Sequence, residues 1–189
     1  MRRYCCPLMK NVIGFALYLN VSTTFTMTID DQQQLFIKMA IDAWNIQIER
    51  TNKLFNSLSD DDLKQHVAPG RNSGVYLLGH LTAVHDALFS LLGLGERLCP
   101  HLDEIFVKNP DRSGLQQPET KQLRNYWNEV NGKLGNHFNN FSVQEWFQKH
   151  TAISDIDFQK EPHRNRLNVL LNRTAHLANH LGQLIFLKK

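Results

Sequence analysis

The segment HLANH, residues 176–180, places two histidines four residues apart near the end of the chain. On an α-helix, side chains at positions i and i+4 lie on adjacent turns of one face, so these two imidazoles could bind one metal ion together. A third histidine from another helix would complete a set of three neutral nitrogen ligands and leave a coordination position for water or substrate. Imidazole suits zinc, nickel, copper and iron, so the ligand type does not select the metal.

The same spacing also has an ordinary explanation. The chain contains nine histidines, and a pair four apart arises easily by chance in such a composition. It also lacks the glutamate that makes the HExxH pattern specific. Five other histidines lie in predicted loops or at predicted helix ends, where a solvated side chain is the simpler interpretation: His66, His101, His137, His150 and His163.

Hydrophobic periodicity predicts four long helices that would position these side chains. The first begins after residue 27, and its expected apolar face is Leu35, Met39, Trp44, Ile46, Leu54 and Leu58. The second covers residues 74–93 behind the N-cap residue Ser73. The third begins at Pro118, with a face that runs from Leu123 to Phe138, and the fourth begins at Pro162 and continues almost to the C-terminus. Short helices are expected after Ser59 and at SVQE, residues 142–145, whereas residues 151–161 are predicted to be a loop.

A long connection joins the second and third of these helices. Residues 94–117 contain prolines and glycines, with one short helical turn expected at HLDEIF. The sequence has no alternating strand pattern, glycine-rich phosphate loop, nucleophile elbow or repeat. We therefore predict an all-α four-helix bundle with a long crossover between helices 2 and 3.

The angular position of each histidine indicates where it points. With about 100° of rotation per residue and Leu167 at 0°, the apolar stripe of the fourth helix covers about 260° to 40°, whereas His176 lies near 180° and His180 near 220°. On the second helix, with Val75 at 0°, the stripe covers about 160° to 300° and His80 lies near 140°. All three histidines thus flank a core stripe, where a helix borders a groove. His85, near 280°, lies inside the stripe and is expected to be a core histidine bonded to a carbonyl.

Charge distribution argues against a nucleic-acid-binding surface. The net charge of +3 is accounted for by Arg2, Arg3 and Lys10, so residues 27–189 are neutral overall. Only Cys99 lies outside the first 26 residues, which fits a reducing, cytoplasmic setting.

Residues 1–26 form a leader with a basic start and an apolar stretch. At about ten residues, this stretch is too short to span a bilayer, which takes roughly 20, and no clear small-x-small cleavage site follows it. Met27 directly precedes the helix-starting sequence TIDDQQQLF. We therefore interpret the leader as a mis-assigned start or a disordered segment, in preference to a signal peptide, and predict one domain over residues 27–189.

Two segments resemble the DinB-like superfamily, which includes the damage-inducible DinB proteins and the bacillithiol and mycothiol S-transferases. NRTAHLANHLGQL, residues 172–184, matches the closing H-x-x-x-H-x-G-Q pattern of that family. PGRNSGVYLLGHL, residues 69–81, matches its earlier serine-to-histidine stretch through Ser73 and His80. The resemblance covers residues 28–189 and implies a four-helix bundle with a crossover.

The resemblance also implies a site and a chemistry. Carried over residue by residue, the ligands of a divalent metal are His80, His176 and His180; zinc or nickel is expected first, then manganese or iron. Characterised members transfer a low-molecular-weight thiol to an electrophile, so an S-transferase-like or hydrolase-like enzyme is expected, and a homodimer is plausible. The alternative is a non-catalytic metal-binding module or a helical interaction module.

No catalytic base follows from the residues. Asp86 is close to His80 in sequence and is expected to be a surface charge. Gln183 and Asn179 could orient a ligand or a histidine, although exposed polar residues on a helix are the commoner case.

Overall fold

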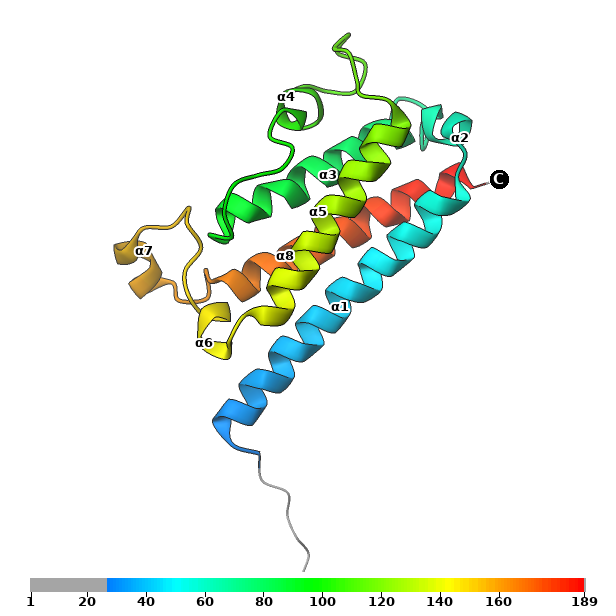
Figure 1. Ribbon diagram of the computed structural model, residues 1–189. Coiled ribbons are helices and arrows are strands. Elements are labelled where there is room, and N and C mark those ends of the chain that lie inside the picture. The colour runs from blue at the N-terminus through cyan, green and yellow to red at the C-terminus, as the bar shows by residue number, and fades with distance from the viewer. Residues whose placement is uncertain (1–26, 189) are drawn as a thin grey trace, which may run out of the picture.

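Four long helices lie side by side in the computed structural model, which describes residues 27–188 (Figure 1). They are α1 (Ile29–Ser57), α3 (Gly74–Leu91), α5 (Thr120–Asn140) and α8 (Arg166–Leu184). Short helices fill the connections: α2 (Asp60–Lys64), α4 (Leu102–Phe106), α6 (Val143–Trp146), α7 (Asp155–Lys160) and the terminal 3-10 turn η1 (Ile185–Leu187). No β-strand forms within residues 27–188. The predictions for residues 1–26 lie outside the described residues.

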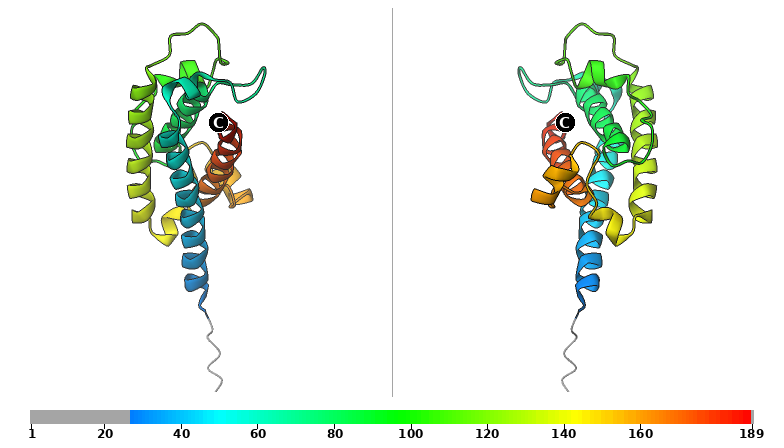
Figure 2. Two further views of the ribbon diagram at one scale, coloured as in Figure 1. Left: turned by 90° about the vertical axis from the view of Figure 1, so that its right-hand side faces the viewer. Right: turned by 90° about the vertical axis from the view of Figure 1, so that its left-hand side faces the viewer.

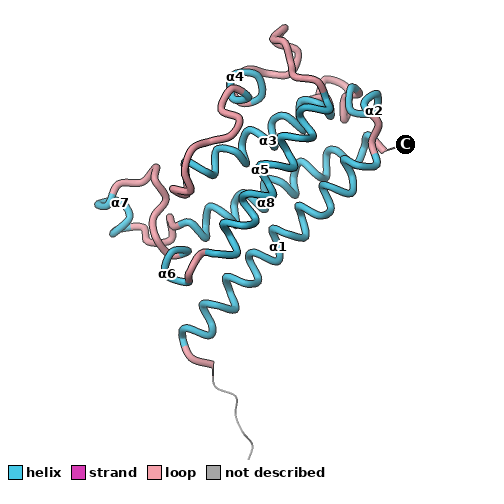
Figure 3. The backbone as a smooth tube through the Cα atoms, in the orientation of Figure 1, coloured by secondary structure: helices cyan, strands magenta, loops and turns pink. Residues whose placement is uncertain are grey.

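The long helices run in an up-down-down-up order, which confirms the predicted crossover. In Figures 1 and 2, α1 and α8 run in one direction and α3 and α5 in the other. Because α3 and α5 are parallel, residues 92–119 must return along the whole bundle, and α4 lies on this return against α3. The antiparallel pair α3 and α8 brings the beginning of α3 beside the end of α8, as the tube in Figure 3 shows. Residues 80 and 180 can therefore meet.

Three helices start at the side-chain caps that the sequence predicted. Ser59 and Ser142 each form a capping box with an acidic residue three positions later. The Ser73 hydroxyl accepts a hydrogen bond from the Tyr76 backbone N–H and starts α3 as expected.

Two predicted helix starts were wrong. The helix expected from Pro162 begins at Arg166, because Asn165 caps it, and α7 lies within the predicted loop of residues 151–161. The helix expected from Pro118 begins at Thr120. A proline that suits the first helical turn can equally well lie just before it, so its position alone does not fix the start.

The core fills the space between the four long helices. Its largest fully buried side chains include Trp44, Trp146, Phe106 and Phe138. The face predicted for α1 is only half right: Trp44, Leu54 and Leu58 are buried, whereas Leu35, Met39 and Ile46 are exposed. The face in contact is Ile37, Ala40, Trp44, Thr51 and Phe55, spaced at helical intervals. Apolar residues occur all round α1, so packing against α8, rather than composition, selects this face.

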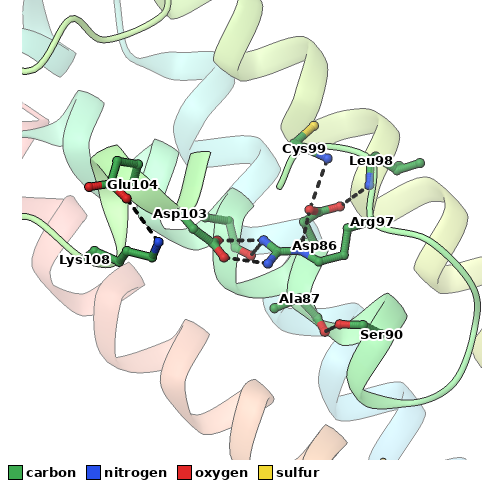
Figure 4. Close-up of polar contacts among 10 residues, drawn as sticks. Asp86, Ala87, Ser90, Arg97, Leu98, Cys99, Asp103, Glu104 and Lys108 are labelled. Carbon is green, nitrogen blue, oxygen red and sulfur yellow. Dashed lines mark hydrogen bonds and ion pairs between the residues drawn. The ribbon is translucent and has the colours of Figure 1, made fainter. Parts of the chain in front are cut away.

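A buried network of ion pairs and hydrogen bonds joins the crossover, residues 92–119, to α3 (Figure 4). The fully buried Asp86 carboxylate accepts hydrogen bonds from the backbone N–H groups of Leu98 (2.7 Å) and Cys99 (3.1 Å) and from Arg97 Nε (3.0 Å). Arg97 also forms a two-pronged pair with Asp103, at 2.5 and 2.6 Å. The prediction that Asp86 is a surface charge was wrong, because the returning chain covers it and supplies its donors.

None of the helices within residues 27–188 is long and apolar enough to cross a membrane.

Candidate metal centre

The bundle brings His80, His176 and His180 together at the junction of α3 and α8. One ring nitrogen from each lies within 4.8 Å of the other two. Nε2 of His176 is 3.4 Å from Nε2 of His80 and 3.1 Å from Nε2 of His180. All three side chains are half-buried. The three residues singled out in the sequence therefore form one cluster, and among residues 27–188 no other group of three histidine, cysteine or acidic residues does so.

Hydrogen bonds fix which nitrogen faces the centre of the cluster. Nδ1 of His80 donates to the carbonyl oxygen of Phe106 at 2.8 Å, because a carbonyl can only accept. Nδ1 of His180 donates to Oε1 of Gln183 at 3.2 Å. In the neutral rings Nε2 then carries the lone pair, so both of these lone pairs face Nε2 of His176. Nδ1 of His176 is buried and has no hydrogen-bond partner among the described residues.

The surroundings keep these rings neutral. Burial lowers the pKa of His80 and of His180 below the ordinary histidine value. Burial, together with the charges of the neighbouring histidines and of Arg173, lowers the pKa of His176 to about 4. Neutral imidazoles with converging lone pairs are the donor set that a divalent transition metal requires, so the residues fit such an ion.

Close packing behind His80 positions its ring. Gly79 lies directly against the Phe106 ring, where a Cβ atom would collide with the ring carbons. Glycine thus lets α4 approach α3 closely enough for the Phe106 carbonyl to reach His80. The His80 ring also stacks on Tyr76, whose hydroxyl donates to the carbonyl of Asn109 at 2.7 Å. The sequence did not indicate a contribution from the crossover, because Phe106 is 26 residues from His80.

One side of the cluster opens into a groove of about 540 Å³. His180 and Gln183 of α8 line it. The remaining lining comes from the loop before α3 and from η1: Val67, Ala68, Gly70, Arg71, Asn72 and Phe186. The groove has both polar and apolar walls and reaches His180 of the cluster, which agrees with the expected position of the histidines at the flank of the core.

His85 does not join the cluster. It is fully buried, and its Nδ1 donates to the side-chain carbonyl oxygen of Asn131 at 2.7 Å, as expected for a core histidine. Its ring packs between Trp44 and Trp127. Burial is the main reason that the pKa of His85 falls to about 3.

The polar residues of α8 near the cluster differ in what they contact. Gln183 contacts His180, so it has the orienting position that the sequence analysis considered, whereas Asn179 is exposed. Arg173 was not considered, although it lies one turn before His176 with its Nε fully buried. Its spacing of three residues from His176, a histidine of the cluster, was the available signal.

Together, the fold and the cluster define an all-α four-helix bundle protein with a three-histidine site. A family model described as the DinB superfamily matches residues 43–184. The chain therefore belongs to the DinB superfamily. No match was found among curated proteins.

A solved structure shares the fold. It is described as the crystal structure of the conserved protein of locus from Enterococcus faecalis, and it aligns with a TM-score of 0.54 at 15% sequence identity. The alignment covers 86% of this chain and 96% of the other. At this identity the similarity extends to the fold alone.

Proposed function

We propose that this protein is a divalent-metal-dependent enzyme of the thiol S-transferase type, with a hydrolase-like reaction as the nearest variant. The observation that supports this best is the convergence of three histidine ring nitrogens within 4.8 Å of one another, beside an open groove that His180 lines. His80, His176 and His180 would hold the ion. When bound, a divalent ion of this kind supplies a Lewis acid that lowers the pKa of a coordinated thiol or water.

The surrounding residues have distinct roles in this proposal. The Phe106 carbonyl and Gln183 orient His80 and His180, so that both rings are ready to bind without rearrangement. The groove beside His180 admits the substrate, and its volume is within the range of small-molecule sites.

The reacting thiol would come from outside the chain. Cys99 is the free cysteine of the described residues, and it is buried in the core. Burial raises the pKa of its thiol to about 11, so Cys99 is a poor nucleophile at neutral pH. A low-molecular-weight thiol and an electrophile are therefore the expected substrates. A homodimer stays a prediction from the family resemblance, and a cytoplasmic location stays a prediction from the use of cysteine.

Metal loading of the full chain tests the site. The purified protein would be loaded separately with zinc, nickel, manganese and iron, and its metal content measured after gel filtration. We expect about one ion per chain in the wild type and in the control His163→Ala, which changes an exposed histidine, and a loss of the ion in His176→Ala. Substoichiometric metal in the wild type after all four loadings would contradict the proposal.

Activity then separates the enzyme from the alternative class. The metal-loaded protein would be assayed for conjugation of several thiols to a panel of electrophiles and for hydrolysis of activated esters and amides. Turnover that disappears in His176→Ala supports the enzyme. One tightly bound ion with no turnover on any substrate would favour the non-catalytic metal-binding module.

A further inference from the structure

Arg173 shares one face of α8 with the two histidines of that helix. Arg173, His176 and His180 stand at positions i, i+3 and i+7, which fall within an arc of about 60°. The arginine lies on the core side of this arc, about 40° from Leu177 and nearer to the stripe than either histidine. The fold therefore directs a permanently charged side chain toward the interior, beside the candidate metal centre.

The chain does not neutralise this charge. Nε of Arg173 is buried without a hydrogen-bond partner, and no ion pair to its guanidinium occurs within residues 27–188. By contrast, Arg97 pairs with Asp86 and Asp103, and Arg124 donates to two backbone carbonyls at the end of α1. Arg173 is half-buried, and withdrawing a cation from water without an ion-pair partner costs free energy, which an anion from outside the chain would offset.

The charge acts on the cluster itself. Arg173 stands one helical turn before His176 on the same face of α8, which places its charge beside the cluster. The cluster contains three neutral imidazoles and no carboxylate. A divalent ion would thus add its positive charge to that of Arg173, and the cluster has no acidic ligand to offset the two. An anionic substrate would supply the missing negative charge.

We propose that Arg173 binds a carboxylate of the thiol substrate whose sulfur reaches the three-histidine cluster. The edge formed by Nε–H and a neighbouring Nη–H can donate two parallel hydrogen bonds to one carboxylate. Arg173 precedes His176 by three residues, roughly 4.5 Å along the helix axis. A thiol with two or three carbon atoms between its sulfur and its carboxylate is short enough to contact two side chains one helical turn apart. This inference rests on the proposed function and specifies the substrate class for the same site.

A matched pair of thiols tests the proposal. The full chain would be loaded with cobalt(II), and the affinities of 3-mercaptopropionate and 3-mercapto-1-propanol measured from the sulfur-to-cobalt absorption. The two probes have the same length and differ only in carboxylate against hydroxyl. We expect the wild type to bind 3-mercaptopropionate more tightly by about tenfold or more, the size of one charge-assisted interaction.

Variants assign the preference to one arginine. Arg173→Gln should lose the preference for 3-mercaptopropionate. Arg173→Lys should keep only part of it, because lysine retains the positive charge but not the two parallel N–H donors. Arg50→Gln is the matched control, since Arg50 is an exposed arginine on α1 that lies outside the groove lining. It should keep the wild-type ratio. Cobalt content and melting temperature report whether each variant is folded.

A measurement on the wild type covers the case in which Arg173→Gln does not fold. The Nε–H signal of Arg173 in a nitrogen-15 NMR spectrum, assigned with Arg173→Lys, should shift when acetate is added to the metal-free protein. A shift without sulfur-to-cobalt absorption from either thiol supports the anion site and contradicts the proposed function alone. Equal affinities for the two thiols with an unmoved Nε–H signal would overturn the inference. Loss of the preference in Arg71→Gln, which changes the exposed arginine of the groove lining, rather than in Arg173→Gln would also overturn it.

Discussion

Burial of neutral His85 should make the folded protein sensitive to acid. In the unfolded chain a histidine has a pKa of about 6.5, whereas in the folded protein burial, and to a smaller extent the charges of Arg173, His176 and His80, lower the pKa of His85 to about 3. Between these two values the unfolded state binds a proton that the folded state does not. Stability contributed by neutral His85 is therefore present above pH 6.5 and is lost as the pH falls toward 3.

The size of this loss follows from the two pKa values. Lowering the pH from 7 to 4.5 should reduce the free energy of unfolding by ~2.5 kcal/mol through His85 alone. For a domain of this size, that corresponds to a fall in melting temperature of roughly 5–10 °C. The His85 side chain is fully buried, so solvent screening does not reduce this figure.

Urea unfolding at pH 7 and pH 4.5, with a chelator present throughout, would measure the effect. The variant His85→Asn removes the titrating group and keeps a side-chain amide that can donate to Asn131. It should be less stable than the wild type at pH 7, since it leaves a cavity between two tryptophans, but it should lose ~2.5 kcal/mol less than the wild type on acidification. His85→Phe, which keeps a ring in that space, provides a second measurement if the asparagine variant does not fold.

The control is His163→Asn, which alters an exposed histidine and should show the wild-type loss between the two pH values. Parallel pH dependences for the wild type and both His85 variants would refute the reasoning, because they would mean that His85 binds protons equally in the folded and unfolded states.

Two further predictions concern the orienting contacts of the fold. Gln183→Ala should weaken zinc binding by about 10- to 100-fold, because His180 loses the acceptor that fixes its tautomer; competition with a chromogenic chelator would measure this, and an unchanged affinity would remove Gln183 from the site. Asp86→Asn should lower the free energy of unfolding by about 3–5 kcal/mol, since Arg97 loses one of its two carboxylate partners in a buried network. Chemical unfolding would detect that change, and a loss under about 1 kcal/mol would show that the network contributes little to stability.

The sequence alone predicted the class of fold and the members of the cluster. Two kinds of signal are local: the periodicity of the long helices and the capping residues Ser59, Ser73 and Ser142. They can be identified without knowledge of the tertiary contacts. The flanking positions of His80, His176 and His180 are likewise properties of single helices. Only the resemblance to a family, however, joined a residue on the second long helix to two residues on the fourth.

Tertiary structure decided the features that depend on which elements meet. Asp86 is buried because the crossover returns over it, and the Phe106 carbonyl reaches His80 because Gly79 allows α4 to approach. The face of α1 that is buried depends on α8, since apolar residues surround that helix. In the sequence Arg173 is one polar residue of α8 among several, and only the fold shows that its Nε is buried without a hydrogen-bond partner among residues 27–188. A sequence specifies the residues on each helix face, but only the packed bundle determines which of their charges and lone pairs are left without a partner.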